Sequence, residues 1–549
     1  MQEAVALHQQ GRLREAEKLC ARVLKAAPEH FDALHLYGLT KAQSGQMGEA
    51  YRLLSAALKL NPRAADAWLN LANVLHALKR DAEALDCLDK ALVLRPGDIT
   101  ALENRGNALI ALGRAQEALT CYDAVLARNP RHAAALINRG NARASLGGAE
   151  AALADFDAAL ALMPGHPLAL YNRGNALLDL GRYPQAVAAY DAALAAAPSH
   201  AQAHNNRGRA LQALNRHAEA LASFDQALAL QKDYADAHFN RALSLLTLGD
   251  LARGFAQYEW RWKRSGMRDP RRGYGKPLWL GEFPLARKTI LLTAEQGLGD
   301  TIQFARYAPL VAKNGARVVL EVQRELKDLV ARVDGVASCH ARGEPLPPFD
   351  VHCPLGSLPL ALRIEPASGP ADIPYLRADG ARLDKWRPRI EALPGKRVAL
   401  AWAGNVQHPN DRNRSIDLKL LEPLFALEGL SFVSVQRELR GNDAELLARH
   451  ANVTHLGSEL ADMADTAAIL TLADLTLAVD TAVAHLAGSL GRPLWVMLAF
   501  APDWRWTLPG DGDKSPWYPQ AQLFRQPALG DWPSVVATLR AELAPLASA

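Results

Sequence analysis

Proline recurs every 34 residues through the first half of this chain. Six prolines keep that interval: Pro28, Pro62, Pro96, Pro130, Pro164 and Pro198. These positions exclude one long helix or a coiled coil, because proline breaks a continuous helix wherever it falls inside one. The spacing therefore predicts a series of short helical units that stack on one another, each ending near a proline.

Three further columns of residues keep the same period. A small residue stands at Ala72, Gly106, Gly140, Gly174, Gly208 and Ala242. Alanine stands at Ala50, Ala84, Ala118, Ala152, Ala186 and Ala220. An aromatic residue stands at Tyr122, Phe156, Tyr190, Phe224 and Tyr258. We expect two helices in each unit, crossing closely at the small residues, with the aromatic ring filling the gap between units.

These columns resemble the tetratricopeptide repeat. The resemblance implies an all-α superhelix over residues 1–264, with repeats from about residue 31. We expect residues 1–30 to be a half-unit that enters the stack. The last unit, residues 234–262, has Lys232 where the next proline would stand, and we expect it to cap the stack.

One polar column lies on the first helix of each unit, which lines the concave face of such a superhelix. Its members are Asn70, Asn104, Asn138, Asn172, Asn206 and Asn240. An amide both donates and accepts hydrogen bonds, so this ladder could pair with an extended peptide of any sequence. Alternatively, each Asn bonds to the neighbouring repeat and stiffens the stack. The ladder resembles that of the protein O-linked N-acetylglucosamine transferases, which implies a protein or peptide acceptor.

The composition changes after residue 258. Ten of the eleven tryptophans lie beyond it, and the stretch that follows is rich in arginine, glycine and proline. We expect a linker at residues 265–286. Its basic residues could bind an anionic partner, but a solvated junction is the favoured interpretation. They are Arg261, Lys263, Arg264, Arg268, Arg271 and Arg272.

Short apolar runs alternate with helical segments from residue 287 onward. Strands are expected at 289–296, 317–322, 349–355, 397–404, 431–436, 475–480 and 493–498. This alternation is typical of βαβ units and parallel sheets. We expect two doubly wound domains, 287–378 and 397–549, joined by a crossing at 379–396. Ligands of such folds bind beyond the carboxyl ends of the strands, here between the two sheets.

The sequence GLGD, which contains Gly297, Gly299 and Asp300, stands between a predicted strand and a predicted helix. Glycines allow a sharp turn and a close approach to a ligand, and Asp300 would face the cleft. Alternatively, Asp300 caps the helix. A dinucleotide-binding fingerprint would need a third glycine where the chain has Ile302, which disfavours an oxidoreductase.

Two more motifs follow strands of the second predicted sheet. Asp480 and Thr481 begin a helix whose N-terminus could bind a phosphate, and His485 lies on the same helical face. The alternative is a plain cap with a packed histidine. A polar loop carries His408, Arg412 and Arg414, and a guanidinium there could clamp a diphosphate. The alternative is a solvated basic loop.

The segments GLGDTIQFARYAPLV, NRSIDLKLLEPL and DTAVAHLAGSLGRP resemble motifs of the bacterial heptosyltransferase family. The resemblance implies a GT-B fold, with an acceptor side at 287–378 and a nucleotide-sugar side at 397–549. It also implies that Asp300 is the general base, and we expect Gly297 and Gly299 to bind the donor. It places Arg414 on the donor phosphates, and Asp480, Thr481 and His485 in the nucleotide-binding segment.

The chain departs from the family at two places. Ala482 replaces a glycine-type residue after Asp-Thr, and the segment Asp503–Trp506 matches no assigned motif. An Asp511–Asp513 pair in a Gly/Pro loop is interpreted as a turn, with a cation site as the alternative.

The sequence thus predicts a metal-independent, inverting glycosyltransferase without a cofactor, whose repeats recruit a protein or peptide acceptor. The alternative is a repeat scaffold with an inactive GT-B region. Net charge is +4, from 62 basic and 58 acidic residues, which does not favour nucleic-acid binding. Five scattered cysteines and the lack of a signal-like or membrane-spanning apolar stretch predict a soluble, cytoplasmic protein.

Overall fold

The computed structural model describes residues 1–266, 273–365, 373–408, 410–506 and 512–547. Within it the chain forms two compact units, residues 1–203 (unit 1) and residues 204–549 (unit 2). Each unit is described by itself. Arg268, Arg271 and Arg272 of the basic cluster lie outside the described residues, as does Asp511.

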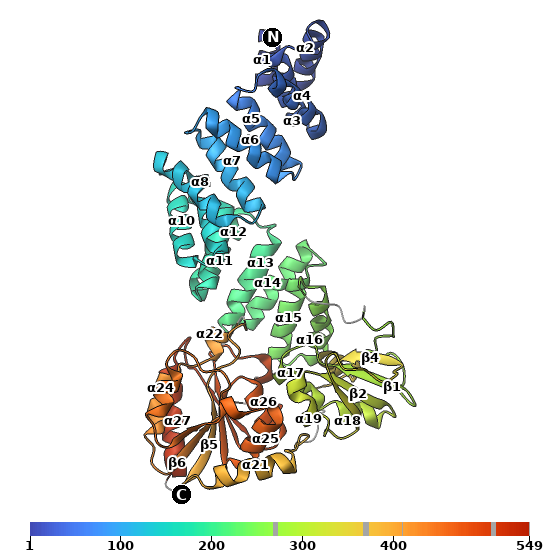
Figure 1. Ribbon diagram of the computed structural model, residues 1–549, viewed down its shortest axis with the longest axis vertical. Helices are drawn as coiled ribbons and strands as arrows, with labels where there is room; N and C mark the ends of the chain where they lie inside the picture. The colour runs from blue at the N-terminus through green and yellow to red at the C-terminus, as the bar shows by residue number, and fades with distance from the viewer. Residues whose placement is uncertain (267–272, 366–372, 409, 507–511, 548–549) are drawn as a thin grey trace. The chain divides into compact units, whose positions relative to one another are not determined.

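Unit 1 consists of helices that pack in consecutive pairs (Figure 1). The pairs are α1 (Gln2–Gln9) with α2 (Leu13–Ala26), α3 (Phe31–Gln43) with α4 (Met47–Leu60), α5 (Ala65–Ala77) with α6 (Asp81–Leu94), α7 (Ile99–Ala111) with α8 (Ala115–Arg128), α9 (Ala133–Ser145) with α10 (Ala149–Leu162), and α11 (Pro167–Asp179) with α12 (Tyr183–Ala196). The periodic prolines fall in the turns between pairs, as predicted. The expected half-unit at residues 1–30 is instead a complete pair, because α1 supplies a short first helix that packs on α2.

Glycine and the aromatic residue of one repeat pack directly against each other. A Cβ added at Gly140 would lie 2.6 Å from the ring of Phe156, and one at Gly174 would lie 2.6 Å from the ring of Tyr190. Both partners belong to the same helix pair, so the ring sets the close crossing within a pair, which requires a residue without a side chain on the first helix. The ring also belongs to a core shared between units, as predicted, since Tyr122 clusters with Leu85 of the preceding pair and Ala142 of the following one.

The last helices of the stack belong to unit 2. They are α13 (Ala201–Ala213), which contains the boundary between the units, α14 (His217–Leu230), α15 (Ala235–Thr247), α16 (Leu251–Tyr258) and the 3₁₀ helix η1 (Glu259–Lys263). Leu246, Phe255 and Tyr258 are buried in the same hydrophobic core as Trp279 and Trp504 of the α/β region. The predicted cap is therefore wrong, because the last pair has an apolar outer face covered by the α/β region. The domain boundary expected at residue 264 therefore differs from the division between the two units, which lies after residue 203.

The first sheet of unit 2 is parallel and has the order β3-β2-β1-β4. Its strands are β1 (Thr289–Thr293), β2 (Arg317–Val322), β3 (Val336–Ala341) and β4 (Val351–Pro354). The helices around it are α17 (Leu298–Ala305), α18 (Ala308–Lys313), η3 (Arg324–Leu326) with α19 (Lys327–Val330), and η4 (Leu355–Ser357) with α20 (Leu358–Ala361). Part of the expected linker runs along this sheet, because the Trp279 N–H donates to the His352 carbonyl at 2.9 Å.

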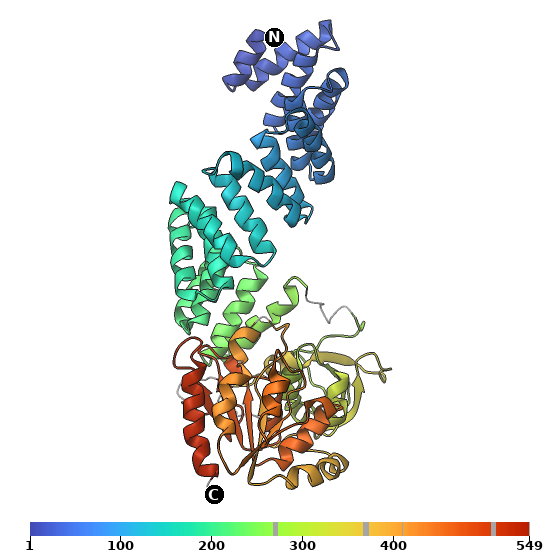
Figure 2. The same cartoon turned by 60° about the vertical axis from the view of Figure 1, so that its left-hand side comes forward.

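The second sheet is parallel and has the order β10-β9-β8-β5-β6-β7. Its strands are β5 (Lys396–Ala401), β6 (Leu430–Ser434), β7 (Val453–His455), β8 (Leu475–Val479), β9 (Leu494–Leu498) and β10 (Ala521–Arg525). The α-helices are α21 (Gly380–Glu391), α22 (Asp411–Arg414), α23 (Glu422–Phe425), α24 (Asp443–Ala448), α25 (Met463–Leu472), α26 (Ala482–Ser489) and α27 (Trp532–Ala547). The 3₁₀ helices are η6 (Leu418–Leu421), η7 (Gly457–Glu459) and η8 (Trp504–Trp506). Helix α27 packs beside α23 and β10 (Figure 2).

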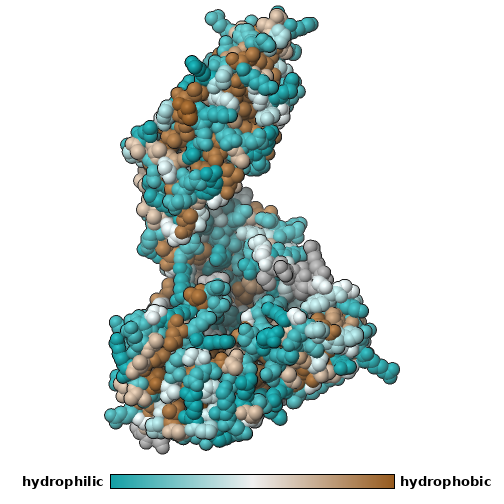
Figure 3. Space-filling model, in the orientation of Figure 1, coloured by the Kyte–Doolittle hydropathy of each residue, from teal (hydrophilic) through white to brown (hydrophobic). Residues whose placement is uncertain are grey.

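Two parallel sheets therefore follow the helical repeats, as predicted. On the face shown in Figure 3, hydrophilic and hydrophobic residues are interspersed over the repeats.

Candidate functional site

Each sheet has one point at which the strand order reverses. In the first sheet β1 lies between β2 and β4, and in the second sheet β5 lies between β6 and β8. Connections leave the carboxyl ends of the two central strands in opposite directions at such a point, which opens a crevice where ligands of doubly wound folds bind. The loops after β1 and β8 carry two of the predicted motifs.

The starts of α17 and α26 meet at Gly299. A Cβ at Gly299 would lie 2.8 Å from His485 Cδ2 and 3.4 Å from Ala482 Cα. Glycine is thus needed here for the approach of one helix start to the other. The structure in this way brings the GLGD motif of the first sheet against the Asp-Thr motif of the second.

Asp300 has both carboxylate oxygens engaged. Oδ2 accepts the Gly297 N–H at 3.1 Å, which is the N3 half of a capping box, with Gly297 as the N-cap of α17. Oδ1 accepts Nη2 of Arg505 at 2.5 Å. Asp300 therefore helps to cap α17, as the alternative interpretation expected, but it does so as the third residue of the helix and not as the N-cap. The ion pair with Arg505 was not predicted.

Arg505 lies in η8 and is buried. Its Nη1 donates to Asp503 Oδ1 at 2.8 Å, and its guanidinium lies over the rings of Trp504 and Phe304, at 4.5 and 5.6 Å from their centroids. The Nε atom has no hydrogen-bond partner among the described residues. Arg505 thus holds a fixed place between two carboxylates, one from each half of the α/β region.

Asp480 follows β8 directly. Its Oδ1 accepts the indole N–H of Trp506 at 2.7 Å and lies 3.9 Å from His485 Nε2. Burial, together with the nearby Asp503 carboxylate, raises the pKa of Asp480 to about 6. This carboxylate is therefore poised to change its charge near neutral pH.

His485 is packed inside the site. Its Nδ1 lies 3.0 Å from the Tyr518 hydroxyl, and its ring stacks on Trp506 with centroids 5.0 Å apart. Burial lowers the pKa of His485 well below its ordinary value, and the charge of Arg505 lowers it further. The structure thus realises the packed-histidine alternative, with a neutral ring.

Thr481 occupies the N-cap position of α26 without capping it through its side chain. Its hydroxyl instead donates to the Val479 carbonyl at 3.3 Å. Thr481 therefore leaves the first backbone N–H groups of α26 without a side-chain cap, and Gly299 of α17 packs beside the first of them.

Arg414 lies at the reversal point of the second sheet. Its guanidinium covers Gly404, where an added Cβ would lie 2.6 Å from Nη2, and Nη1 donates to the Asp480 carbonyl at 3.3 Å. The Nε atom has no partner among the described residues. His408 and Arg412 are exposed in the same loop. The loop therefore places one of its predicted cations at the crevice.

A buried polar cluster joins the last repeat to the first sheet. It contains Arg261, so for this residue the expected solvated junction is wrong. Arg261 is 1% exposed and donates to Ser357 Oγ at 2.6 Å and to Glu295 Oε1 at 3.2 Å. Burial raises the pKa of Glu295 to about 6. The position of Glu295, directly after a strand and before GLGD, was the signal available in the sequence.

The asparagine column bonds from repeat to repeat. In unit 1, Asn104 donates to Asn73 at 2.7 Å, Asn138 to Asn107 at 3.1 Å and Asn172 to Asn141 at 2.7 Å. Asn70 contacts His35 at 2.9 Å and Asn240 donates to Asn205 at 3.0 Å, both across repeats, whereas Asn206 accepts from its neighbour Asn205 within one helix at 3.1 Å. The structural alternative is thus realised between repeats, through a second asparagine column that the sequence interpretation missed.

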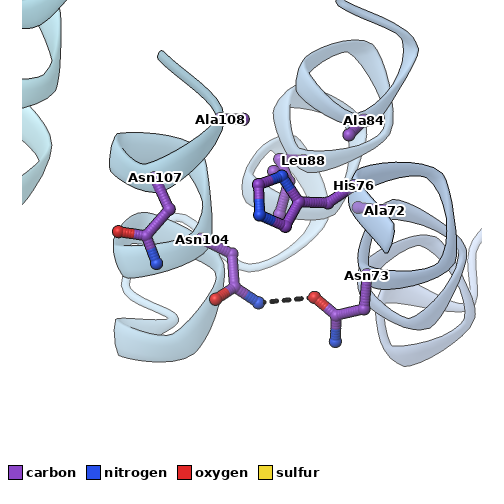
Figure 4. Close-up of a pocket in the computed structure, with 8 residues that line it drawn as sticks. All are labelled: Ala72, Asn73, His76, Ala84, Leu88, Asn104, Asn107 and Ala108. Carbon is purple, nitrogen blue, oxygen red and sulfur yellow. Dashed lines mark hydrogen bonds between the residues drawn. The ribbon is translucent and has the colours of Figure 1, made fainter. Parts of the chain in front are cut away.

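The same face holds a small pocket between α5 and α7 (Figure 4). The Asn73–Asn104 hydrogen bond crosses it, and His76 and Asn107 line it with Ala72 and Leu88. In this bond Asn104 uses one amide hydrogen and Asn73 uses its carbonyl oxygen. The ladder therefore keeps polar atoms on the face where a peptide was predicted.

Among the described residues, no group of three His, Cys, Asp or Glu side chains is placed to hold a metal ion. None of the described helices combines the length and apolar character that a bilayer crossing requires.

Comparisons with known proteins bear on the helical half. The family described as "Tetratricopeptide repeat" matches residues 104–167, 171–232 and 206–270. The family described as "Anaphase-promoting complex, cyclosome, subunit 3" matches residues 9–91. The N-terminal half is a stack of tetratricopeptide repeats. Repeats of this kind present extended concave surfaces to protein partners.

A curated relative is Protein FlbA of Caulobacter vibrioides, which is 27% identical over 310 residues. That alignment covers 51% of this chain, and the chain spans about half (50%) of FlbA.

Solved structures are similar as well. A tetratricopeptide repeat protein from Parabacteroides merdae is 21% identical, with 44% of this chain and 94% of that chain covered and a TM-score of 0.37. The APC/C hetero-tetramer Cut9–Hcn1 is 18% identical, with coverages of 48% and 52% and a TM-score of 0.37. The PilF protein of Pseudomonas aeruginosa is 22% identical, with coverages of 39% and 96% and a TM-score of 0.35.

Proposed function

We propose that the α/β region is a glycosyltransferase that moves a sugar from a nucleotide-sugar donor to an acceptor hydroxyl. The tetratricopeptide repeats would bind the protein or peptide that carries this hydroxyl. The observation that carries the proposal is the meeting of two reversal points at Gly299, which gathers Asp300, Arg505, Asp480 and Arg414 into one cluster. The resemblance of the three motifs to heptosyltransferases supports it.

The donor diphosphate would lie at the second sheet. Arg414 offers a guanidinium whose Nε has no partner among the described residues, and α26 offers N–H groups at its start. Both favour an anion, since a charge-assisted hydrogen bond is stronger than a neutral one and a helix N-terminus carries a partial positive charge. The adjoining Asp480 carboxyl, whose pKa is raised, would repel a diphosphate less when it is protonated.

Asp300 would act as the general base at the first sheet. The acceptor oxygen attacks the anomeric carbon, its proton passes to the Asp300 carboxylate, and the bond from that carbon to the diphosphate breaks. The nucleoside diphosphate leaves with a charge that Arg414 and α26 stabilise. The proposed reaction needs neither a metal nor a cofactor, and one displacement would invert the anomeric centre.

A donor screen tests the proposal. Wild-type protein and the Asp300→Asn variant are incubated with uridine, adenosine, guanosine and cytidine diphosphate sugars and a lysate depleted of small molecules, and sugar transfer to protein is measured by mass spectrometry. We expect one nucleotide class to support transfer, with turnover lowered by roughly 10²–10⁴ in the variant. Absence of transfer and of donor binding for every class would reject the glycosyltransferase.

A second candidate function is a repeat scaffold with an inactive α/β region. The observation that favours it is the full engagement of Asp300 by Gly297 and Arg505, because both carboxylate oxygens already have partners and an acceptor hydroxyl would have to displace one of them. Nucleotide binding separates the two candidates, since a pure scaffold needs no diphosphate site.

A further inference from the structure

We infer that Arg505 binds the donor diphosphate, and that in the donor-free protein it holds Asp300 in an ion pair that the diphosphate displaces. The inference rests on the proposed function and assigns a role to the segment Asp503–Trp506, which matched no motif. Its consequence is that the base becomes available only after the donor has bound.

The first argument is the way in which Arg505 is held. Asp503 binds Nη1 at 2.8 Å and also accepts the backbone N–H of Arg505 at 3.0 Å, so this carboxylate fixes the arginine locally. Trp504 and Phe304 cover the guanidinium. These contacts keep the guanidinium in place when its other partner leaves, and Asp503 alone suffices to balance its charge.

The second argument is the asymmetry between its two carboxylate partners. Asp503 is two residues away and moves with η8, whereas Asp300 belongs to the other sheet and is 27% exposed. Nη2 therefore bonds to the carboxylate that the other sheet carries, although Asp503, at 35%, is the more exposed of the two. A phosphate offers the guanidinium a bidentate partner of higher charge, which competes well with one carboxylate oxygen.

The third argument is the balance of charge around the crevice. Besides Arg505 and Arg414, the described residues place Arg306 there, buried among Tyr375, Trp517 and Tyr518 and held by neutral oxygens. Arg306 is fully buried. The charges of all three arginines act on His485, so they lie near the carboxylates of Asp300, Asp480 and Asp503. When Asp300 leaves Arg505 and turns toward an acceptor hydroxyl, the positive charges near the donor outnumber the negative ones. Negative charge develops on the donor diphosphate during transfer, and these positive charges would stabilise it.

The proton and bond changes of the proposed reaction are unaltered, but their order is fixed. Donor phosphate first takes Nη2 of Arg505, and the freed Asp300 oxygen then accepts the hydrogen bond of the acceptor hydroxyl. Proton removal is in this way limited to the complex that contains both substrates.

A double-mutant cycle tests the inference. Calorimetry measures the dissociation constants of uridine, adenosine, guanosine and cytidine diphosphate for full-length wild type, Asp300→Asn, Arg505→Gln and the double variant. We expect Arg505→Gln to weaken the bound nucleotide by roughly 10–100-fold. Asp300→Asn should tighten it by roughly 3–10-fold, because the phosphate no longer competes with a carboxylate.

The double variant separates competition from simple repulsion. Repulsion between Asp300 and a phosphate persists without Arg505, so it would give the same tightening in both backgrounds, and that result overturns the inference. A nucleotide affinity that is the same in Asp300→Asn as in wild type also overturns the inference. The proposed function still stands in that case, provided that the wild type binds a nucleotide. Absence of binding of every nucleotide overturns both. If Arg505→Gln does not fold by tryptophan fluorescence, Arg505→Lys, which keeps the buried charge but loses the planar fork, completes the cycle with the same expected loss of coupling.

Discussion

The pKa of Asp480 is set by opposing effects of its neighbours and of its burial. Its side chain is 18% exposed, and its carboxylate lies between the Trp506 indole N–H and the neighbouring Asp503. The indole stabilises the charged form, whereas burial and the second carboxylate oppose it. The raised pKa shows that the opposing effects win.

This balance predicts how stability depends on pH. A carboxyl whose pKa rises from 3.8 to about 6 on folding contributes stability below pH 3.8 that is lost as the pH rises through about 6. Asp480→Asn keeps the acceptor for Trp506 but does not ionise. Relative to wild type, the variant should therefore gain about 2 kcal/mol of unfolding free energy between about pH 4 and about pH 7.5. Urea unfolding followed by tryptophan fluorescence reports unit 2, and a difference that stays constant with pH would contradict the prediction.

The sequence located the site residues better than it described their contacts. Asp300, Asp480 and Arg414 each follow a strand end, and parallel strands bring such positions to one edge. The partner of Asp300 could not be predicted in this way, because Arg505 reaches it from a segment 205 residues away. For His485, the helical face was readable, but the stacking on Trp506 depends on η8, which is short and has no periodic pattern.

At the scale of elements, the helix pair is set by one contact between a glycine and a ring. Gly140→Ala would push a Cβ against Phe156, so we expect a loss of about 1–3 kcal/mol. Gly48→Ala is the matched control, since Gly48 lies in α4 and its added Cβ meets nothing within 4 Å. The control should stabilise by about 0.5–1 kcal/mol, the difference between glycine and alanine in a helix. Thermal unfolding followed by helical circular dichroism measures both, and equal effects would refute the packing argument.

The asparagine contacts between repeats predict a difference between two like substitutions. Asn107 Oδ1 accepts both Asn138 and the Tyr122 hydroxyl, the latter at 2.8 Å. Asn138→Asp therefore sets a carboxylate against an amide oxygen that cannot turn away without losing the tyrosine, and should cost about 1–2 kcal/mol.

The matched variant lies one repeat further on. Asn172→Asp faces Asn141, and the aromatic position of that repeat is Phe156, which has no hydroxyl. Asn141 can turn its amide and donate to the new carboxylate, so we expect a loss below about 0.5 kcal/mol. Equal melting temperatures for the two variants would show that these contacts do not tie the repeats together.

Elements with a strong pattern were predicted, and elements without one were missed. The strands β1, β5, β8 and β9 are buried apolar runs, and the sequence predicted each of them. The strands β3, β7 and β10 were missed because their partly exposed residues give no continuous run. The helix expected after GLGD breaks into α17 and α18, where Pro309 in the first turn of α18 has no N–H to continue the helix.

At the scale of the whole molecule, the last repeats are part of the α/β unit. Helix α15 packs against η8 and α16 packs against α20, and both belong to the core that contains Trp279. Periodicity alone gave an end of the repeats at residue 264, because the 34-residue step continues to Tyr258 whatever covers its last helices. The sequence could not show that the covering surface is another part of the same chain.

This division predicts how fragments behave. Residues 199–549 begin between repeats and keep α13 to α16, so we expect a folded, monodisperse fragment. Residues 265–549 leave the partners of Leu246, Phe255 and Tyr258 exposed, so we expect aggregation or unfolding. Size-exclusion chromatography with circular dichroism compares them, and a folded, soluble 265–549 fragment would contradict the account.

The most direct test of the proposed function is a calorimetric titration of the full-length protein with the four nucleoside diphosphates. We expect one of them to bind, and we expect Arg414→Ala to weaken that binding by about 1.5–3 kcal/mol, the range for a hydrogen bond to a charged group. Arg412→Ala, in the exposed part of the same loop, is the control and should leave the affinity unchanged. Binding that is absent for all four nucleotides, or that Arg414→Ala leaves unchanged, would contradict a donor site at the reversal point of the second sheet.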